Sequence, residues 1–90
     1  MKKLNNPFLD KLPLCDLHGE IRETVPIILN NFIEEQLILK QTKFIVMHGI
    51  GEGVVKEACY DHLKQNKYVK DFYLEPSNAG ITIVNLKPKS

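Results

Sequence analysis

The chain has 90 residues, with 12 Lys and Arg against 11 Asp and Glu and a formal net charge of +1 at pH 7. This length suits one small domain. Hydrophobic residues make up 43% of the sequence and charged residues 26%, which is typical of a chain that folds and excludes disorder as the main state. The near-neutral charge excludes a strongly basic nucleic-acid binder, so any affinity for a polyanion must come from local geometry.

Apolar runs in the sequence are far shorter than the roughly 20 residues that span a bilayer, and the first residues lack the apolar region of a signal peptide. Cys15 and Cys59 show neither the spacing of a metal site nor that of a redox motif. We therefore expect a cytoplasmic protein with no membrane partner, in which both cysteines are small buried hydrophobes.

Residues 1–11 show neither helical nor alternating periodicity, which predicts an extended N-terminal arm ahead of one domain over residues 12–88. Residues 12–17 form a short run that is apolar except for one Asp and leads to Gly19. This run predicts the first strand.

A helix is predicted from about residue 22 to residue 40, because apolar side chains recur there with the spacing of one buried helix face: Val25, Ile28, Leu29, Phe32 and Ile33. Thr24 is a candidate N-cap, and Pro26 falls in the first turn, where a missing N–H costs little. The β-branched and aromatic run over residues 43–47 then predicts a second strand.

A second helix is predicted over residues 54–65, after a loop that holds three glycines. Residues 69–74 and 80–86 read as two strands joined by a turn at 75–78, which predicts a closing hairpin. The order β-α-β-α-β-β predicts an α/β fold of two layers, with two helices packed on a mixed four-stranded sheet.

Asp16 and His18 follow the first predicted strand, and their i, i+2 spacing in extended backbone places both side chains on one face. A carboxylate beside an imidazole orients it for proton exchange near neutral pH. We therefore consider His18 a candidate general base or acid. The structural alternative is that both side chains only satisfy backbone groups of the loop.

The second predicted strand leads into the loop His48-Gly49-Ile50-Gly51-Glu52-Gly53, which precedes a helix. Glycines allow positive φ and expose backbone N–H groups, while a helix start adds unpaired donors, so a phosphate fits here. The alternative is a tight turn in which glycine only relieves crowding. The glycine spacing matches neither the dinucleotide fingerprint nor the Walker loop.

Three segments taken together resemble the Smr (small MutS-related) domain: Cys15-Asp16-Leu17-His18-Gly19, the glycine loop 48–53, and residues 78–86, in which Asn78-Ala79-Gly80 leads into the last strand. The resemblance covers about residues 12–88. It implies a fold similar to the C-terminal domain of bacterial translation initiation factor three, and a nucleic-acid endonuclease function.

Residue by residue, the resemblance assigns the cleavage motif of the family to Asp16 and His18 and its nucleic-acid contacts to the glycine loop, that is to His48, Gly49, Gly51 and Gly53. We also expect Lys56, in the first turn of the following helix, to contact nucleic acid. Some bacterial members cut messenger RNA on stalled ribosomes, so the ribosome is an expected partner beside RNA or DNA.

We hypothesise cleavage of RNA by its own 2′-hydroxyl, because this reaction needs a base, an acid and an anion site, and His18 and His48 would serve as base and acid. Hydrolysis with Mg²⁺ would need several carboxylates, and the loops offer few, so we expect no metal or other cofactor. Two alternatives stay open: a nucleic-acid- or ribosome-binding module without catalysis, and a DNA-nicking endonuclease of recombination or repair.

Overall fold

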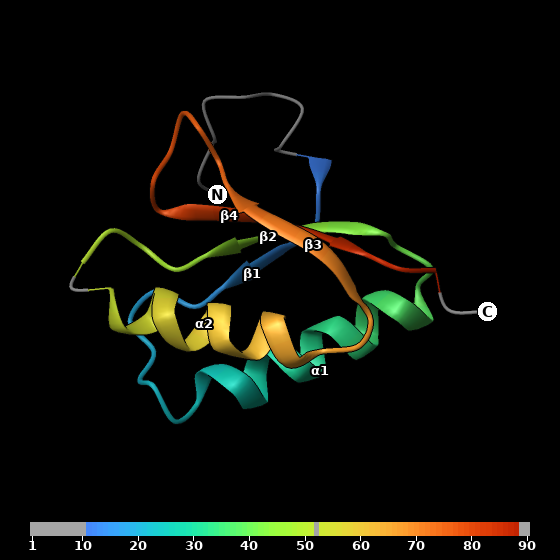
Figure 1. Ribbon diagram of the computed structural model, residues 1–90, viewed down its shortest axis with the longest axis horizontal. Coiled ribbons are helices and arrows are strands. Elements are labelled where there is room, and N and C mark those ends of the chain that lie inside the picture. Colours follow the sequence, from blue (N-terminus) through green and yellow to red (C-terminus); the bar gives the residue numbers. More distant parts are fainter. Residues whose placement is uncertain (1–10, 52, 89–90) are drawn as a thin grey trace.

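The computed structural model describes residues 11–51 and 53–88 and folds them into a four-stranded sheet with two helices (Figure 1). The elements in chain order are β1 (Leu14–Asp16), α1 (Val25–Ile38), β2 (Lys43–Met47), α2 (Val54–Gln65), β3 (Val69–Leu74) and β4 (Ile81–Leu86). The predicted fold class and order of elements are confirmed. The predicted N-terminal arm lies outside the described residues, apart from Lys11.

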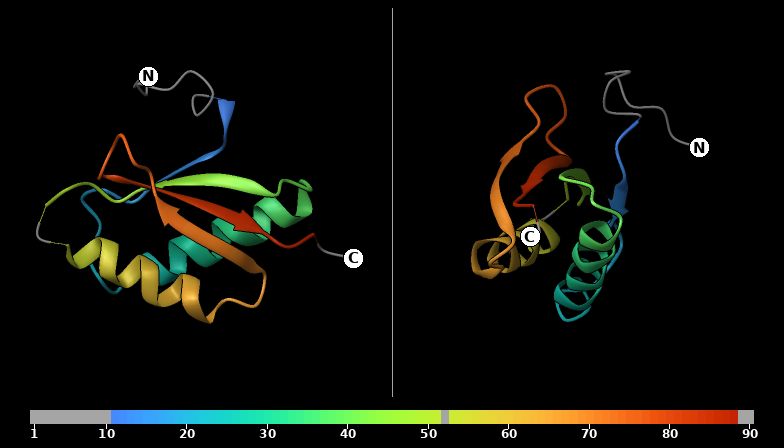
Figure 2. Two further views of the ribbon diagram at one scale, coloured as in Figure 1. Left: turned by 45° about the horizontal axis from the view of Figure 1, so that its top comes forward. Right: turned by 90° about the vertical axis from the view of Figure 1, so that its right-hand side faces the viewer.

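The sheet has the strand order β1-β2-β4-β3. β1 and β2 run parallel, whereas β4 runs antiparallel to both of its neighbours, so the predicted β3–β4 hairpin is confirmed. The last strand therefore lies inside the sheet, between β2 and β3. Both helices lie on one face of the sheet, which gives the molecule two layers (Figure 2).

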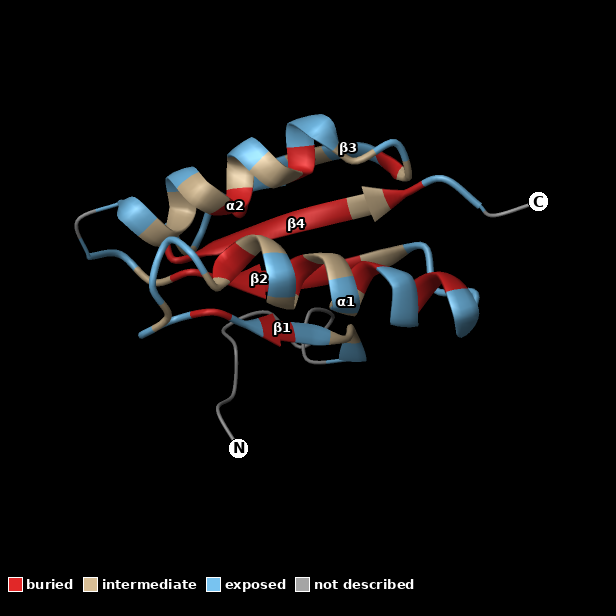
Figure 3. Ribbon diagram, turned by 90° about the horizontal axis from the view of Figure 1, so that it is seen from below, coloured by how far each residue is buried: buried red, intermediate tan, exposed pale blue. Residues whose placement is uncertain are grey.

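The main core lies between the helices and the sheet, as seen from the helix side in Figure 3. α1 contributes Val25, Leu29, Ile33 and Leu37 to it, at the spacing of one helix face. Cys15 and Cys59 are unpaired and buried in this core, as expected. Because side chains alternate along a strand, Ile45, Ile81 and Ile83 form a second, smaller cluster on the opposite face of the sheet.

The two ends of α1 differ from their predicted form. Thr24 stands at the N-cap position, but its hydroxyl donates to the Ile21 carbonyl oxygen and the Glu20 carboxylate, each at 3.0 Å, so it caps no helical N–H. The helix ends at Ile38 rather than at Lys40, because Lys40 adopts φ 61° in the left-handed region. Within residues 11–51 and 53–88, no helix combines the length and apolar character needed to cross a bilayer.

Candidate functional site

The loops after β1 and β2 lie side by side at one edge of the sheet. Because the two strands are parallel, their carboxyl ends meet there. The Leu17 N–H donates to the Met47 carbonyl oxygen at 2.8 Å and ties the two loops together. A Cβ placed on Gly49 would lie 3.7 Å from the Cβ of His18, so the predicted catalytic pair adjoins the glycine loop.

Asp16 and His18 form a direct pair at the end of β1. The Nδ1 atom of His18 lies 2.5 Å from Oδ1 of Asp16, and the same oxygen accepts the backbone N–H of His18 at 3.2 Å. Their side chains are 46% and 58% exposed. Asp16 therefore fixes the orientation of an accessible imidazole and leaves its Nε2 atom available for proton exchange.

His48 has a different environment from His18, because only 5% of the residue is exposed. Its Nδ1 atom bonds to the Gly49 carbonyl oxygen at 3.0 Å, and its Nε2 atom to Oγ1 of Thr82 at 2.8 Å. Burial lowers the pKa of His48, and the charge of Lys56 lowers it further, while the bond to Gly49 acts in the opposite direction. His48 is thus a buried imidazole with both ring nitrogens engaged.

The glycine loop is anchored at its first glycine, which adopts φ 80°. The loop pattern predicts that this residue's backbone N–H is exposed to a ligand. Instead, the N–H of Gly49 donates to the carbonyl oxygen of Gly80 at 3.1 Å. Among the described residues, neither the Gly51 N–H nor the Gly53 N–H donates a backbone hydrogen bond. The donors that this loop offers therefore lie nearer to α2.

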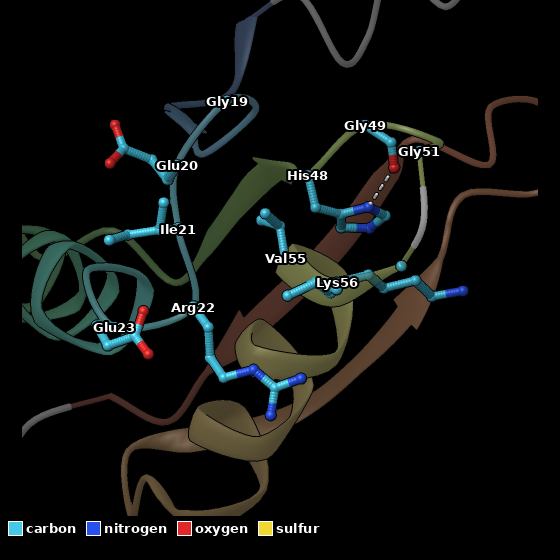
Figure 4. Close-up of a pocket in the computed structure, with 12 residues that line it drawn as sticks. Gly19, Glu20, Ile21, Arg22, Glu23, His48, Gly49, Gly51, Val55 and Lys56 are labelled. Atoms are coloured by element: carbon cyan, nitrogen blue, oxygen red, sulfur yellow. Dashed lines mark hydrogen bonds between the residues drawn. The ribbon is translucent and has the colours of Figure 1, made fainter.

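The start of α2 opens onto a pocket of about 580 Å³ (Figure 4). Its N-cap is Gly53, with φ 85° and no side-chain cap, and the first helical bond runs from the Glu57 N–H to the Gly53 carbonyl oxygen at 2.9 Å. The N–H groups of the first turn, at residues 54–56, are thus left unpaired within the helix, and they favour an anion. The pocket wall also includes residues from both loops, among them Gly19, His48, Gly49 and Gly51.

Charges of both signs surround this pocket. Arg22 lies along α2 (Figure 4), with Nη2 3.5 Å from the Glu57 carboxylate, and both side chains are exposed. The Nζ atom of Lys56 lies 5.5 Å from the centroid of the Tyr60 ring. Glu20 and Glu23 also belong to the wall. The part of the chain that the structure describes holds no group of three or more His, Cys, Asp or Glu arranged for a metal ion.

Two residues of the site were not expected from the sequence. Thr82 is fully buried on β4, and Tyr60 of α2 places its Oη atom 2.8 Å from Oγ1 of Thr82. A threonine inside the apolar run Ile81-Thr82-Ile83-Val84 was the available signal, because a buried hydroxyl needs a hydrogen-bond partner. Its partner, His48, is 34 positions away.

The fold and the two loops define a small two-layer α/β domain with a polar site at the carboxyl ends of two parallel strands. A sequence profile of the Smr domain matches residues 15–87. The chain therefore belongs to the Smr domain family, as its three motifs indicate.

Several relatives extend this comparison. The endonuclease MutS2 of Streptococcus equi subsp. equi (strain 4047) is 40% identical over 74 residues, which cover 79% of this chain and 10% of that protein. The endonuclease MutS2 of Streptococcus pneumoniae (strain Hungary19A-6) is 39% identical over 75 residues, covering 80% of this chain and 10% of that protein. The chain thus spans about a tenth of the length of these curated relatives.

Two solved structures share the fold. The Smr domain of Thermus thermophilus MutS2 has a TM-score of 0.82 and 26% sequence identity, covering 86% of this chain and 100% of that one. YdaL, a stand-alone small MutS-related protein from Escherichia coli, has a TM-score of 0.78 and 18% identity, covering 97% of this chain and 79% of that one.

Proposed function

We propose that this protein is a nucleic-acid endonuclease that cleaves RNA at the edge of the sheet where the two loops meet. One observation carries the proposal: the imidazole of His18 is accessible, held by Asp16 at 2.5 Å, and adjacent to the glycine loop. The similarity to MutS2 endonucleases supports the same class of reaction. The two unpaired, buried thiols fit a reducing compartment such as the cytoplasm.

Nε2 of His18 is the proton acceptor in the mechanism that we propose. It takes the proton of a ribose 2′-hydroxyl, whose oxygen attacks the adjacent phosphorus. The bond from phosphorus to the 5′-oxygen breaks, the departing oxygen takes up a proton from water, and a 2′,3′-cyclic phosphate is left. Asp16 stabilises the imidazolium that forms on His18, and positioned proton transfer of this kind contributes about 10²–10⁴-fold to the rate.

The phosphate is placed in this proposal by the unpaired N–H groups at the start of α2, with Gly51, Gly53 and Lys56 beside it. Donors held in place before the reaction stabilise the charge that develops on the phosphate oxygens. The Gly49 N–H donates to Gly80 and supports the loop instead.

His48 supports the loop in our proposal, because a buried imidazole with both nitrogens bonded is poorly placed to exchange protons with a substrate. Its role as the acid stays a prediction from the sequence.

The mixed charges around the pocket support only weak attraction to RNA. We therefore include a partner that presents the RNA, with the ribosome as the candidate.

The test of this proposal compares three labelled substrates: RNA, DNA, and RNA with a single 2′-deoxy substitution at the cut site. Each is incubated with the purified protein, with and without a chelator. We expect cleavage of RNA in both conditions, a cyclic phosphate product, and no cut at the deoxy linkage. Equal cleavage of the deoxy linkage would contradict the 2′-hydroxyl mechanism, and cleavage of DNA would favour the nicking alternative.

Two substitutions separate catalysis from binding. His18→Ala should slow cleavage by about 10²–10⁴-fold with little change in RNA affinity. Asp16→Asn keeps the shape of the site, removes the charge beside the imidazole, and should slow cleavage by at least about tenfold. Salt-sensitive binding with no cleavage by the wild-type protein, alone or with ribosomes, would instead support the non-catalytic binding module.

A further inference from the structure

A continuous chain of hydrogen bonds runs through the protein interior beneath the glycine loop. The Oη atom of Tyr60 lies 2.8 Å from Oγ1 of Thr82, which lies 2.8 Å from Nε2 of His48, whose Nδ1 atom lies 3.0 Å from the Gly49 carbonyl oxygen. Thr82 is fully buried and His48 nearly so. These hydrogen bonds link α2, β4 and the loop after β2.

The hydrogen bonds of this chain run in one direction. A carbonyl oxygen only accepts, so Nδ1 of His48 carries the proton that is donated to Gly49. In the neutral imidazole Nε2 then accepts, and the Thr82 hydroxyl is its donor. The oxygen of Thr82 in turn accepts the proton of Tyr60, so every member of the chain is satisfied without a charge.

The position of Gly49 depends on this chain. Its carbonyl oxygen accepts from His48, while its N–H donates to Gly80 at 3.1 Å, so both of its backbone polar groups are held. The Tyr60 ring packs edge-on between His48, at 6.2 Å between centroids, and Phe72, at 4.9 Å. The Lys56 ammonium lies 5.5 Å from the centroid of the same ring.

We propose that Thr82 and Tyr60 are positioning residues: together with the Gly49 carbonyl oxygen they hold His48 as the Nδ1–H tautomer, and His48 in turn holds Gly49 and the glycine loop in the shape that receives a phosphate. This inference rests on the proposed function, because it assumes that the loop receives a phosphate of nucleic acid. The hydrogen bonds between these residues are all neutral. Loss of the Thr82 hydroxyl would leave the Nε2 atom of the buried His48 imidazole without a donor.

The test compares Thr82→Val, Thr82→Ser and Tyr60→Phe with wild type, and uses Thr42→Val, at an exposed threonine, as the matched control. Circular dichroism checks the fold of each variant. NMR of the ¹⁵N-labelled imidazoles reads the tautomer of His48, and titration with a labelled RNA reads affinity. Neither reading depends on cleavage.

We expect Thr82→Val to lose the single His48 tautomer and to weaken RNA binding by about tenfold, and Thr82→Ser to restore both. Tyr60→Phe should give a smaller loss, because the bond between Thr82 and His48 remains. If Thr82→Val folds and keeps both the tautomer and the affinity, the proposal is wrong. If Thr82→Val does not fold, an unchanged tautomer and affinity in Tyr60→Phe would overturn the role of Tyr60.

The outcome also separates this inference from the function itself. A wild-type protein that binds RNA without cutting it would overturn the endonuclease proposal, while a tautomer that depends on Thr82 would still support the positioning role. Conversely, cleavage by the wild type at a rate that Thr82→Val leaves unchanged would support the endonuclease and overturn the positioning role.

Discussion

A Cβ atom added to Gly80 would lie 3.4 Å from the Cα atom of Gly49, at the short end of van der Waals contact, and 3.3 Å from Oδ1 of Asn78. The two glycines are also joined by the hydrogen bond from the Gly49 N–H to the Gly80 carbonyl oxygen. The residue just before β4 thus supports the glycine loop by close backbone packing, and a side chain at Gly80 would crowd this contact.

Gly80→Ala should therefore displace the loop. We expect a loss of about 1–3 kcal/mol in the free energy of unfolding, because the added methyl overpacks a buried site, together with weaker RNA binding. Gly51→Ala is the matched control in the same loop, since nothing lies within 4 Å of its added Cβ, and it should change stability by less than about 0.5 kcal/mol. Urea unfolding of both variants checks this, and equal losses would contradict it.

Charge at the pocket gives a second prediction. Glu57 lies 3.5 Å from Arg22 and offsets its charge, so Glu57→Gln should tighten RNA binding about twofold to fivefold at low salt and have little effect at high salt. Glu35→Gln, on exposed α1 surface, is the control for Glu57→Gln. Equal effects of Glu35→Gln and Glu57→Gln would show that only net charge matters.

The salt dependence of binding tests Lys56. Lys56→Ala should reduce the slope of log K against log salt by about 1 if Lys56 contacts a phosphate.

Stability should fall in mild acid because of two histidines. Burial lowers the pKa of both His48 and His62 below the ordinary value of 6.5, and Nε2 of His62 is buried without a hydrogen-bond partner among the described residues. Below pH 6.5 the unfolded chain therefore binds protons that the folded chain does not, so stability decreases as pH falls from 6.5 toward the folded-state pKa values. Urea unfolding between pH 7.5 and 5.5 measures this slope.

The same series assigns the slope to its residues. His62→Gln and His48→Gln each remove one imidazole, so each should flatten the dependence of unfolding free energy on pH. A slope that neither substitution changes would mean that other groups cause the acid sensitivity.

The two thiols should be unreactive while the protein is folded. Burial raises the pKa of Cys15 and of Cys59 from 9.0 to about 12, with smaller contributions from the charge of Asp16 on Cys15 and from Cys15 on Cys59. The thiolate fraction near pH 8 is then roughly a thousandfold lower than for a free thiol. Iodoacetamide labelling followed by mass spectrometry should show both cysteines reacting only in denaturant, and labelling of either in buffer alone would contradict their burial.

The elements of this fold are predictable because each one has a local cause. The helical spacing from Val25 to Ile33 and the β-branched run ahead of the glycines act within a few residues. The pairing of Asp16 with His18 is predictable for the same reason, since the two are separated by one residue of extended chain.

The parts that the sequence does not predict depend on contacts between distant residues. No local pattern indicates that β4 enters the sheet between β2 and β3. The burial of His48 follows from that position, because β4 brings Thr82 to it from 34 positions away. The sequence therefore predicts an accessible acid at His48, the histidine before the glycine loop, and only the strand order reveals its buried environment.

The central place of β4 also has a consequence for synthesis. β4 follows the other three strands and both helices in the sequence, yet it supplies Thr82, and the residue just before it, Gly80, to the loop after β2. A growing chain that has emerged only as far as β3 holds Asp16, His18 and the glycines but lacks the strand that arranges them. These residues can therefore acquire this arrangement only after β4 has left the ribosome exit tunnel. Under the proposed function, a partly synthesised chain would not present that geometry to the RNA around it.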